Sequence, residues 1–283
     1  MPKRGAGAPP RSKRGEAMDL PKNRFKHAIA EGRLQIGLWS QLAEATAAEV
    51  LADAGYDFVV IDAEHAPNDV LRAIPQLQVL DRSPTSAVVR MPWNDLVLTK
   101  RYLDIGAQTL LVPYVQNAEE ARRAVFGVRY PPLGGRGVGT MHRANRYGRI
   151  DDYLANAASE ICLLVQVETE EALDRLEEIA AVDGLDGVFI GPSDLSASMG
   201  HVGNPNHPDV QAAITEVPRR LKSIGKPAGI LTPVEAEARR YIAAGYVYVA
   251  VGSDLGLLAN ETAALAARFQ EPETADAGRS RAQ

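Results

Sequence analysis

The stretch Ile161–Glu168, with the sequence ICLLVQVE, is a nearly continuous apolar run that ends in polar residues. A run of this kind, without strict alternation, is typical of a strand that is covered on both faces of a parallel sheet. Seven similar runs occur along the chain, at Leu34–Trp39, Phe58–Glu64, Ala87–Met91, Thr109–Val115, Gly187–Pro192, Ala228–Leu231 and Tyr246–Val251. Together they predict a parallel α/β sheet.

Segments with apolar residues at helical spacing lie between these runs, and several end just before a glycine, as helices commonly do. The expected helices are Ala45–Asp53, Val70–Leu80, Asp95–Leu103, Ala118–Phe126, Glu170–Ile179, Val210–Ile224 and Pro233–Ala243. Eight strands alternating with helices predict a single (β/α)₈ barrel of the TIM type. A doubly wound open sheet is the alternative, but the glycine-rich turn that binds dinucleotides is missing after the first two strands.

Charge is distributed unevenly along the 283 residues. Residues 1–26 carry eight Lys and Arg against two acids, so the remainder has a net charge near −11 within a total of −5. We expect residues 1–26 to form a basic disordered tail, residues 27–270 the barrel, and residues 271–283 a polar C-terminal tail. The long connection from about residue 127 to 159, which contains PPLGGRGVG at Pro131–Gly139, is expected to be functional or disordered.

The composition excludes several classes of function. An acidic body argues against a nucleic-acid-binding surface, because affinity for phosphates needs concentrated positive charge. No apolar run reaches about 18 residues, so no membrane span is expected. The single cysteine, Cys162, rules out an internal disulfide and fits a reducing compartment. We therefore expect a cytoplasmic enzyme that acts on small molecules.

Catalytic residues of a (β/α)₈ barrel lie at the carboxyl ends of its strands, and two carboxylates follow strands here. Glu168 ends the fifth predicted strand and Asp194 follows the sixth. Carboxylate and water oxygens make a hard site that suits Mg²⁺, Mn²⁺ or Co²⁺, so we interpret both residues as metal ligands. The alternatives are that Glu168 merely opens the next helix and that Asp194 caps one. Gln166 has the parity of Glu168 and points to the same side of the strand.

Arg90 and His65 also follow predicted strands. A buried cation needs a partner, and the guanidinium of Arg90 suits a carboxylate or enolate oxygen, although a structural salt bridge is the alternative. His65 stands among acids and could act as a general base, directly or through a metal-bound water. The other histidines fall in helical or loop segments, where solvated or capping roles are expected: His27, His142, His201 and His207.

Two kinds of chemistry lack the residues they need. A Schiff-base aldolase requires a lysine at the barrel centre, and none of the eight predicted strands contains one. Zinc held by histidines or cysteines is disfavoured because no such cluster stands out in the sequence. An enolate stabilised by a divalent metal ion is therefore favoured, and no organic cofactor is expected.

Five segments of this sequence, within a match that runs from about Gly32 to Phe269, resemble the metal-dependent pyruvate aldolases typified by 4-hydroxy-2-oxoheptanedioate aldolase. The segments are Ile61–Asn68 (IDAEHAPN), Leu103–Leu111 (LDIGAQTLL), Arg129–Pro132 with Arg136–Gly139 (RYPP and RGVG), Leu163–Glu168 (LLVQVE) and Asp186–Ser196 (DGVFIGPSDLS). The family often has Gly where Ala63 stands and Ala where Ser193 stands, and both positions lie beside the expected site. The preferred acceptor aldehyde therefore stays open.

The resemblance implies roles for individual residues. Glu168 and Asp194 would bind the metal, and Arg90 would hold the pyruvate oxygen. His65, paired with Asp104, would carry out the acid–base step. Gln166 and the backbone around Ser193 and Asp194 would help to place the pyruvate carboxylate. The residues near the acceptor end would be Trp39, Asp62, Val138 and Leu231. The family also implies a homohexamer built from exchanged C-terminal helices.

The activity implied by the resemblance is cleavage of 4-hydroxy-2-oxo acids to pyruvate and an aldehyde, with 4-hydroxy-2-oxoheptanedioate giving succinic semialdehyde. A relative that acts on a sugar-derived acid, of the 2-dehydro-3-deoxy-glucarate or -rhamnonate type, is the alternative. A non-catalytic metabolite-binding barrel and a CoA-ester lyase are further readings. The set of His65, Arg90, Glu168 and Asp194 disfavours the former, and the lack of a basic cluster for CoA phosphates weakly disfavours the latter.

Overall fold

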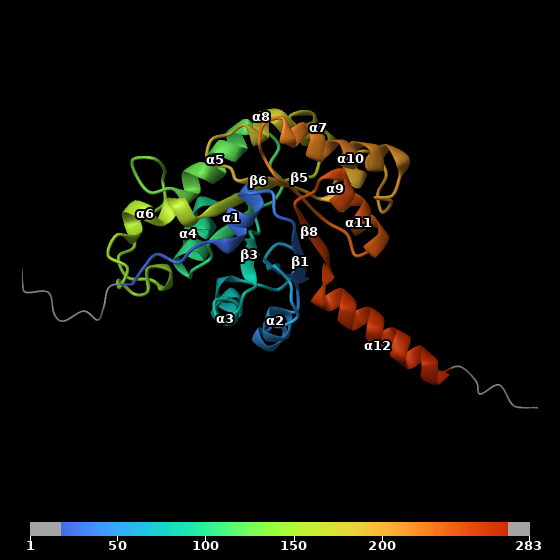
Figure 1. The fold of residues 1–283 in the computed structure, drawn as a ribbon, viewed down its shortest axis with the longest axis horizontal. Helices are drawn as coiled ribbons and strands as arrows, with labels where there is room; N and C mark the ends of the chain where they lie inside the picture. The colour runs from blue at the N-terminus through green and yellow to red at the C-terminus, as the bar shows by residue number, and fades with distance from the viewer. Residues whose placement is uncertain (1–17, 271–283) are drawn as a thin grey trace, which may run out of the picture.

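A computed structural model describes residues 18–270, and these residues form a closed barrel of eight parallel strands in sequence order (Figure 1). The strands are β1 (Gln35–Ser40), β2 (Phe58–Asp62), β3 (Ser86–Arg90), β4 (Thr109–Val112), β5 (Cys162–Val167), β6 (Gly187–Ile190), β7 (Ala228–Leu231) and β8 (Tyr248–Ser253). The barrel closes by parallel pairing of β1 with β8. The predicted (β/α)₈ fold is therefore confirmed, and each predicted strand overlaps an observed one.

Helices surround the barrel and follow the strands. They are α2 (Ala45–Ala52), α3 (Val70–Leu80), α4 (Leu96–Asp104), α5 (Ala118–Val128), α7 (Glu170–Asp174), α8 (Leu176–Ala180), α9 (Pro192–Ser198), α10 (Pro208–Lys222) and α11 (Glu235–Ala244). The single helix expected over Glu170–Ile179 is divided into α7 and α8 at Arg175. The prediction had no helix at α9, which starts directly on Pro192 at the end of β6.

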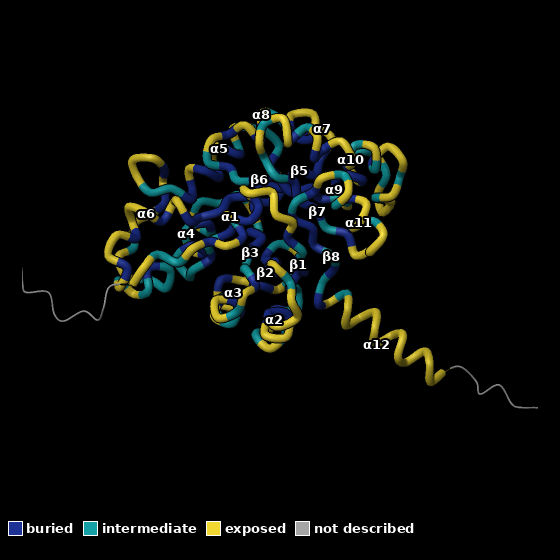
Figure 2. The backbone as a smooth tube through the Cα atoms, in the orientation of Figure 1, coloured by how far each residue is buried: buried dark blue, intermediate teal, exposed yellow. Residues whose placement is uncertain are grey.

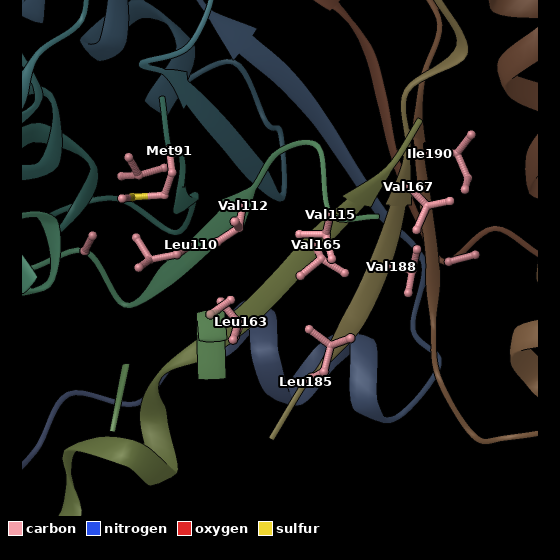
Figure 3. Close-up of a cluster of buried hydrophobic side chains, with 14 of the residues drawn as sticks. Met91, Leu110, Val112, Val115, Leu163, Val165, Val167, Leu185, Val188 and Ile190 are labelled. Atoms are coloured by element: carbon pink, nitrogen blue, oxygen red, sulfur yellow. The ribbon is translucent and has the colours of Figure 1, made fainter. Parts of the chain in front are cut away.

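Alternate residues of each strand face two separate apolar regions. Leu163, Val165 and Val167 of β5 belong to the large cluster between the strands and the helices, part of which Figure 3 shows. Cys162 and Leu164 belong to the smaller cluster inside the barrel. Gln166 therefore shares the inward parity of Cys162 and Leu164. The inward row of β5 thus leads from the core to the polar carboxyl end.

Aromatic side chains fill the barrel interior, and two glycines make room for them. A Cβ atom on Gly37 would lie 2.5 Å from the ring of Phe58, and one on Gly229 would lie 1.9 Å from the ring of Tyr248. Any larger residue at either glycine would have to displace an aromatic ring from a closely packed core. These close contacts make the barrel a packed core rather than a pore.

The N-terminal boundary lies earlier than the sequence predicted, because the helix α1 (Arg24–Ala30) closes the amino end of the barrel. Phe25 is fully buried, and its ring centroid lies 5.1 Å from that of Phe58 and 5.7 Å from that of Tyr248. The basic residues around it bind acceptors on the barrel: Lys22 Nζ lies 2.8 Å from Glu160 Oε1, and Lys26 Nζ donates to Ile161 O at 2.6 Å. The rest of the expected tail, and the expected tail at 271–283, lie outside the described residues.

The long connection between α5 and β5 is ordered and lies at the amino end of the barrel. It contains the short 3₁₀ helix η1 (Arg143–Asn145) and the helix α6 (Tyr153–Glu160), neither of which was predicted. The connection begins where α5 ends and finishes where β5 begins, and both points lie at the amino ends of the parallel strands. Figure 1 shows α6 close to α4 and away from α7 to α11. This position separates the loop Arg136–Gly139 from the carboxyl ends of the strands.

The last helix, α12 (Asp254–Gln270), projects away from the barrel (Figures 1 and 2). Asp254 is its only buried residue, and it leaves five large apolar side chains in solvent: Leu255, Leu257, Leu258, Leu265 and Phe269. In the described part of the chain, no helix is long and apolar enough to span a bilayer.

We expect Phe25→Ala to destabilise the protein by about 3–5 kcal/mol, because the cavity left under Phe58 and Tyr248 cannot collapse against the rigid strands. Urea denaturation would measure the change in the free energy of unfolding. Phe126→Ala removes the same ring from a half-exposed position and serves as the control. Equal losses for the two variants would mean that α1 is not part of the core.

Candidate active site

The carboxyl ends of β2 and β3 hold a buried ion pair between Asp62 and Arg90. The two residues are register partners on neighbouring strands, so their side chains meet across the strand pair. Arg90 Nε donates to Asp62 Oδ1 at 3.0 Å and Nη2 donates to Oδ2 at 2.8 Å, a bidentate arrangement. Asp62 is fully buried and Arg90 is 7% exposed. The sequence reading foresaw a partner for Arg90 but not its identity.

Two further groups hold the Arg90 guanidinium. Its Nη1 lies 2.9 Å from Glu64 Oε2, and its carbon lies 4.1 Å from the ring centroid of Trp39. A guanidinium stacked on an indole face is stabilised by the ring quadrupole. Each Nη atom still has one N–H bond beyond those contacts, which can donate to a substrate oxygen. The structure thus brings Trp39, Asp62 and Arg90 together at one rim.

The Asp62 carboxylate organises the loop that follows β2. Its Oδ1 accepts the backbone N–H groups of Glu64 and His65 at 3.0 and 3.1 Å, and its Oδ2 accepts Gln41 Nε2 at 3.0 Å. Burial alone would raise the pKa of Asp62, but the hydrogen bonds and charge of Arg90, aided by Gln41, hold it below its usual range. Asp62 therefore stays ionised and keeps Arg90 charged and oriented.

Glu168 lies directly after β5 and is 3% exposed. Its Oε2 accepts Gln166 Nε2 at 3.0 Å and its Oε1 accepts the backbone N–H of Tyr114 at 2.8 Å. Tyr114 has φ +56, a conformation that is uncommon for a bulky residue. A Cβ atom on Gly191 would lie 2.4 Å from Glu168 Oε2, so the glycine admits the carboxylate. Strain at Tyr114 and the small residue at 191 together fix Glu168 in place.

Burial, aided by the nearby charges of Glu64 and Asp194, raises the pKa of Glu168 to about 7, against the lowering effect of the Tyr114 N–H and of Arg90. Burial likewise raises the pKa of Glu64. Three carboxylates that repel one another in a partly buried site favour a bound cation, because a cation offsets both burial and repulsion. Gln166 Oε1 is buried without a hydrogen-bond partner among the described residues, and it adds an oxygen that can accept a donor or a cation. This donor set consists of hard oxygens and fits a divalent metal ion.

Asp194 and Ser193 lie in the first turn of α9 and are both exposed. The N-cap of α9 is Gly191, and no side chain caps the helix, so Asp194 does not have the capping role that was its alternative. Its carboxylate acts on the titration of both Glu168 and Glu64. The turn from β6 into α9 thus presents Asp194 beside Glu168.

His65 and Leu231 lie at the same end of the barrel. The His65 side chain is 63% exposed, and its Nε2 lies 3.9 Å from Glu64 Oε1. Leu231 ends β7 and packs against the interior cluster that contains Trp39. His65 is therefore an accessible imidazole at the rim, held through its backbone by Asp62.

The structure does not bring Asp104 or Val138 to this site within one chain. Asp104 ends α4, which returns from β3 to the amino end of the barrel, whereas His65 follows β2 at the carboxyl end. The Asp104 carboxylate instead accepts Arg136 Nη2 at 2.8 Å and lies 3.8 Å from His142 Nε2. Val138 is 57% exposed in the long connection beside the same cluster. Asp104 lies just before β4, at the amino ends of the strands, and is therefore a barrel length away from His65 at their carboxyl ends.

Sequence reasoning missed three residues that build the site: Gln41, Glu64 and Tyr114. Glu64 stands between two residues that were selected, so its position after β2 was a usable signal. Gln41 and the backbone N–H of Tyr114 had no signal in the sequence, because each acts through one contact with a residue far along the chain. Only folding reveals such pairs.

A second group of possible ligands consists of His201 and His207, on the loop before α10, and Asp209 in the first turn of that helix. The two imidazole rings stack at 3.5 Å with an interplanar angle of 13°. Face-to-face rings cannot direct their in-plane lone pairs at one ion. His207 Nδ1 also accepts the N–H of Asp209 at 3.3 Å as the N-cap of α10, which is the capping role expected from the sequence.

The sequence model of the HpcH/HpaI aldolase/citrate lyase family matches residues 35–261. The chain belongs to this family. Three relatives of known name cover nearly their own full length: a pyruvate aldolase of Rhizobium etli (58% identical, 89% of this chain and 99% of the relative), a 4-hydroxy-2-oxo-heptane-1,7-dioate aldolase of Salmonella dublin (55%, 88% and 95%) and a 5-keto-4-deoxy-D-glucarate aldolase of an Enterobacter species (51%, 89% and 99%).

A crystal structure of a family member from Burkholderia cenocepacia has 39% identity and a TM-score of 0.85, covering 88% of this chain and all of that one. These findings confirm the resemblance and the barrel. As a member of the HpcH/HpaI family with aldolases as close relatives, the protein is a carbon–carbon lyase. The Glu168 and Arg90 rim is therefore the candidate active site of an aldolase.

We expect Glu168→Gln to stabilise the metal-free protein at pH 8. Folding raises the pKa of Glu168 from 4.5 to about 7, so the folded state becomes less stable relative to the unfolded state as pH rises through this range. At alkaline pH the loss in the free energy of unfolding is roughly 3 kcal/mol. The gain should shrink to well below that near pH 5, where Glu168 is mostly protonated in the folded state. Denaturant unfolding in EDTA at both pH values measures it.

Glu160→Gln is the matched control of opposite sign. Burial alone would raise the pKa of Glu160, but Lys22, Asn23 and His27 lower it, so its stabilisation is present above about pH 4.5 and is lost in acid. We expect Glu160→Gln to destabilise the protein at pH 8. A loss of stability for Glu168→Gln at pH 8 would contradict the raised pKa.

Proposed function

We propose that the protein is a divalent-metal-dependent aldolase that cleaves 4-hydroxy-2-oxo acids to pyruvate and an aldehyde. The observation that carries the proposal is the buried Glu168, which has a pKa near 7 and faces Asp194 and the Arg90 guanidinium. A deprotonated Glu168 is costly unless a cation binds beside it, and a polarised 2-oxo acid needs both that cation and a nearby donor. The same rim offers carboxylates that would bind the cation and the Arg90 guanidinium as the donor.

Glu168 and Asp194 would hold Mg²⁺, Mn²⁺ or Co²⁺. The ion would supply Lewis-acid polarisation of the 2-oxo acid when bound. None of the eight strands contains a lysine, so the barrel offers no amine for Schiff-base chemistry at its centre. This pattern supports enolate chemistry without an organic cofactor.

The chain's own residues would act on three parts of the substrate. Gln166 and the backbone around Ser193 and Asp194 would place the pyruvate carboxylate, and the free N–H bonds of Arg90 would hold the 2-oxo oxygen, where negative charge develops. His65 would accept the proton of the 4-hydroxyl group, directly or through water. The C3–C4 bond then breaks, its electron pair passes to the 2-oxo oxygen as the pyruvate enolate, and the former C4–OH becomes the aldehyde. Proton transfer to C3 yields pyruvate.

The acceptor end would be formed by Trp39, Asp62 and Leu231. For the aldehyde we favour succinic semialdehyde, so that 4-hydroxy-2-oxoheptanedioate is the substrate, in line with the relative from Salmonella. A deoxy sugar acid is the second candidate, because a relative of comparable identity is named for 5-keto-4-deoxy-D-glucarate. The enolate half of the reaction is the same for both.

We expect the EDTA-treated protein to release no pyruvate from 4-hydroxy-2-oxoheptanedioate and to regain release when Mg²⁺, Mn²⁺ or Co²⁺ is added. Glu168→Gln should lower kcat/KM by at least ~10²-fold under the same conditions, because a charged partner of the metal is lost. A coupled lactate dehydrogenase assay measures pyruvate.

An aldehyde panel in the synthetic direction separates the two substrates. A preference for hydroxylated aldehydes over succinic semialdehyde would favour the sugar-acid aldolase. Metal-independent turnover that survives Glu168→Gln would overturn the mechanism. A folded protein without turnover on any aldehyde would favour a metabolite-binding barrel or a CoA-ester lyase.

A second copy of the chain would complete this site. Asp104 and Val138, which the family resemblance places beside His65 and the acceptor, lie together at the amino end of the barrel, so a single neighbouring copy that presents this end could supply both. The exposed leucines and Phe269 of α12 support exchange of this helix between copies, because monomers rarely leave such a face in solvent. We therefore propose a cytoplasmic homo-oligomer, specifically a hexamer. Asp104 would be a positioning residue for the partner's imidazole.

A mixture of two impaired variants tests the shared site. We expect His65→Ala and Asp104→Asn to be impaired separately, and a one-to-one mixture, dissociated and reassembled, to recover about one quarter of the sites as wild type. Pyruvate release before and after reassembly measures the recovery. No recovery, from a mixture that size-exclusion chromatography shows to be reassembled, would mean that each site is built from one chain.

A further inference from the structure

The first residue of α12, Asp254, binds the loop that follows β1. Its carboxylate accepts the backbone N–H of Gln41 at 2.7 Å and that of Leu42 at 3.3 Å, and it also accepts the N–H of Leu255 in its own helix. Asp254 is 7% exposed although the helix that it begins is otherwise in solvent. The carboxylate therefore joins α12 to the β1–α2 loop.

The side chain of Gln41 continues this connection into the active site. Its Nε2 donates to Asp62 Oδ2 at 3.0 Å, the same oxygen that accepts Arg90 Nη2 at 2.8 Å. Gln41 thus connects α12 to the ion pair through two hydrogen bonds: its backbone N–H binds Asp254, and its side-chain amide binds Asp62, which in turn binds Arg90. None of these residues is a proposed metal ligand.

The β1–α2 loop stores strain that this path stabilises. Ala43 is buried and has φ +59, a conformation that non-glycine residues adopt only where the surroundings impose it. Asp254 supplies part of that constraint on one side. On the other side, Asn68 Nδ2 donates to the carbonyl oxygens of Ser40 and Asp62 at 3.2 and 2.9 Å. The loop is thus held from both sides, by Asp254 and by Asn68.

We propose that Asp254 and Gln41 are positioning residues for aldol cleavage, and that they couple the seating of α12 on another copy to the orientation of Arg90. The inference rests on the proposed function for its kinetic consequence. Asp254 is the buried residue that attaches α12 to its own barrel, so docking of the rest of the helix on another copy acts on Asp254 and on its bonds to the loop. A shift at Asp254 is transmitted to Arg90, where a displacement of about 1 Å can cost up to ~10²-fold in rate.

A double-mutant cycle between Asp254→Asn and Gln41→Met tests the path. Both substitutions keep the approximate size of the side chain: Gln41→Met removes the amide that binds Asp62, and Asp254→Asn removes the charge and one of the two oxygens that accept N–H groups of the loop. We expect each to lower kcat for pyruvate release about ten-fold, with little change in the Mn²⁺ concentration needed for half-activity, because Glu168 and Asp194 lie off the path. The double variant should be no worse than the more impaired single variant, since residues on one path are not additive.

Asp57→Asn is the matched control. Asp57 Oδ2 also accepts a backbone N–H, that of Ile36 at 2.8 Å, but at the amino end of β1, whereas Gln41 follows the carboxyl end of this strand. We expect this variant to keep the wild-type kcat. Additive effects of Asp254→Asn and Gln41→Met, or an equal loss for Asp57→Asn, would overturn the proposal. Thermal unfolding and size-exclusion chromatography of every variant identify any that fails to fold or assemble.

Fluorescence tests the path without turnover. The chain has two tryptophans, and in a Trp93→Phe background the emission reports on Trp39, whose ring lies 4.1 Å from the Arg90 guanidinium. We expect the same emission change for Asp254→Asn, Gln41→Met and the double variant, and none for Asp57→Asn. A wild-type protein without aldolase activity that shows this pattern would refute the proposed function alone, whereas unchanged emission would refute the path.

Discussion

A buried cation sets the conditions for the rest of this site. The guanidinium of Arg90 is desolvated, and it is tolerable only because Asp62 binds it through two bonds while Glu64 and the face of Trp39 cover its other sides. Removing one partner of such a pair leaves an uncompensated charge, at a cost of about 3–5 kcal/mol. The register of β2 against β3 is therefore as much a part of the chemistry as the side chains, because a slip of one residue would separate Asp62 from Arg90.

The opposite pole of the site is anionic and is constrained by the backbone. Glu168 is buried, close to two other carboxylates, and fixed by a strained tyrosine and by the glycine beneath it. A protein that kept this arrangement for stability alone would pay for it twice, in desolvation and in strain. Both features gain a purpose if a divalent cation binds there, because the cation reverses the sign of the local electrostatics.

The two ends of the barrel have different tasks. Helix α1 and the connection between α5 and β5 close the amino end with aromatic and basic residues, and the carboxyl end gathers the polar residues of the candidate site. The helix α12 begins at the carboxyl end, directly after β8, but leaves the barrel, and its apolar residues face solvent (Figure 2). Its first residue nevertheless binds the loop that orients the Asp62–Arg90 pair. If residues of another copy complete the site, as we propose, the bonds from Asp254 through Gln41 to Asp62 would let the site respond to assembly.

The sequence by itself determined the class and order of the elements. Apolar runs such as Ile161–Glu168 mark strands buried on both faces, and the barrel rule then places Arg90, Glu168, Asp194 and His65 at one rim, because the carboxyl ends of parallel strands coincide. These inferences depend on local patterns of apolar and polar residues, which can be recognised in a short segment without knowledge of the rest of the chain. The buried helix α1 escaped prediction because its polar and basic residues obscured the one apolar ring, Phe25, that closes the barrel.

Tertiary structure alone decided which side chains touch. Gln41 reaches Asp62 across 21 positions and Asp254 reaches Gln41 across 213, and no pattern within either segment records the other. The structure also separated Asp104 from His65, because a helix between strands returns the chain to the opposite end of the barrel. The physical reason is that periodicity fixes the direction of a side chain relative to its own element, whereas the partner it meets depends on how all eight strands close.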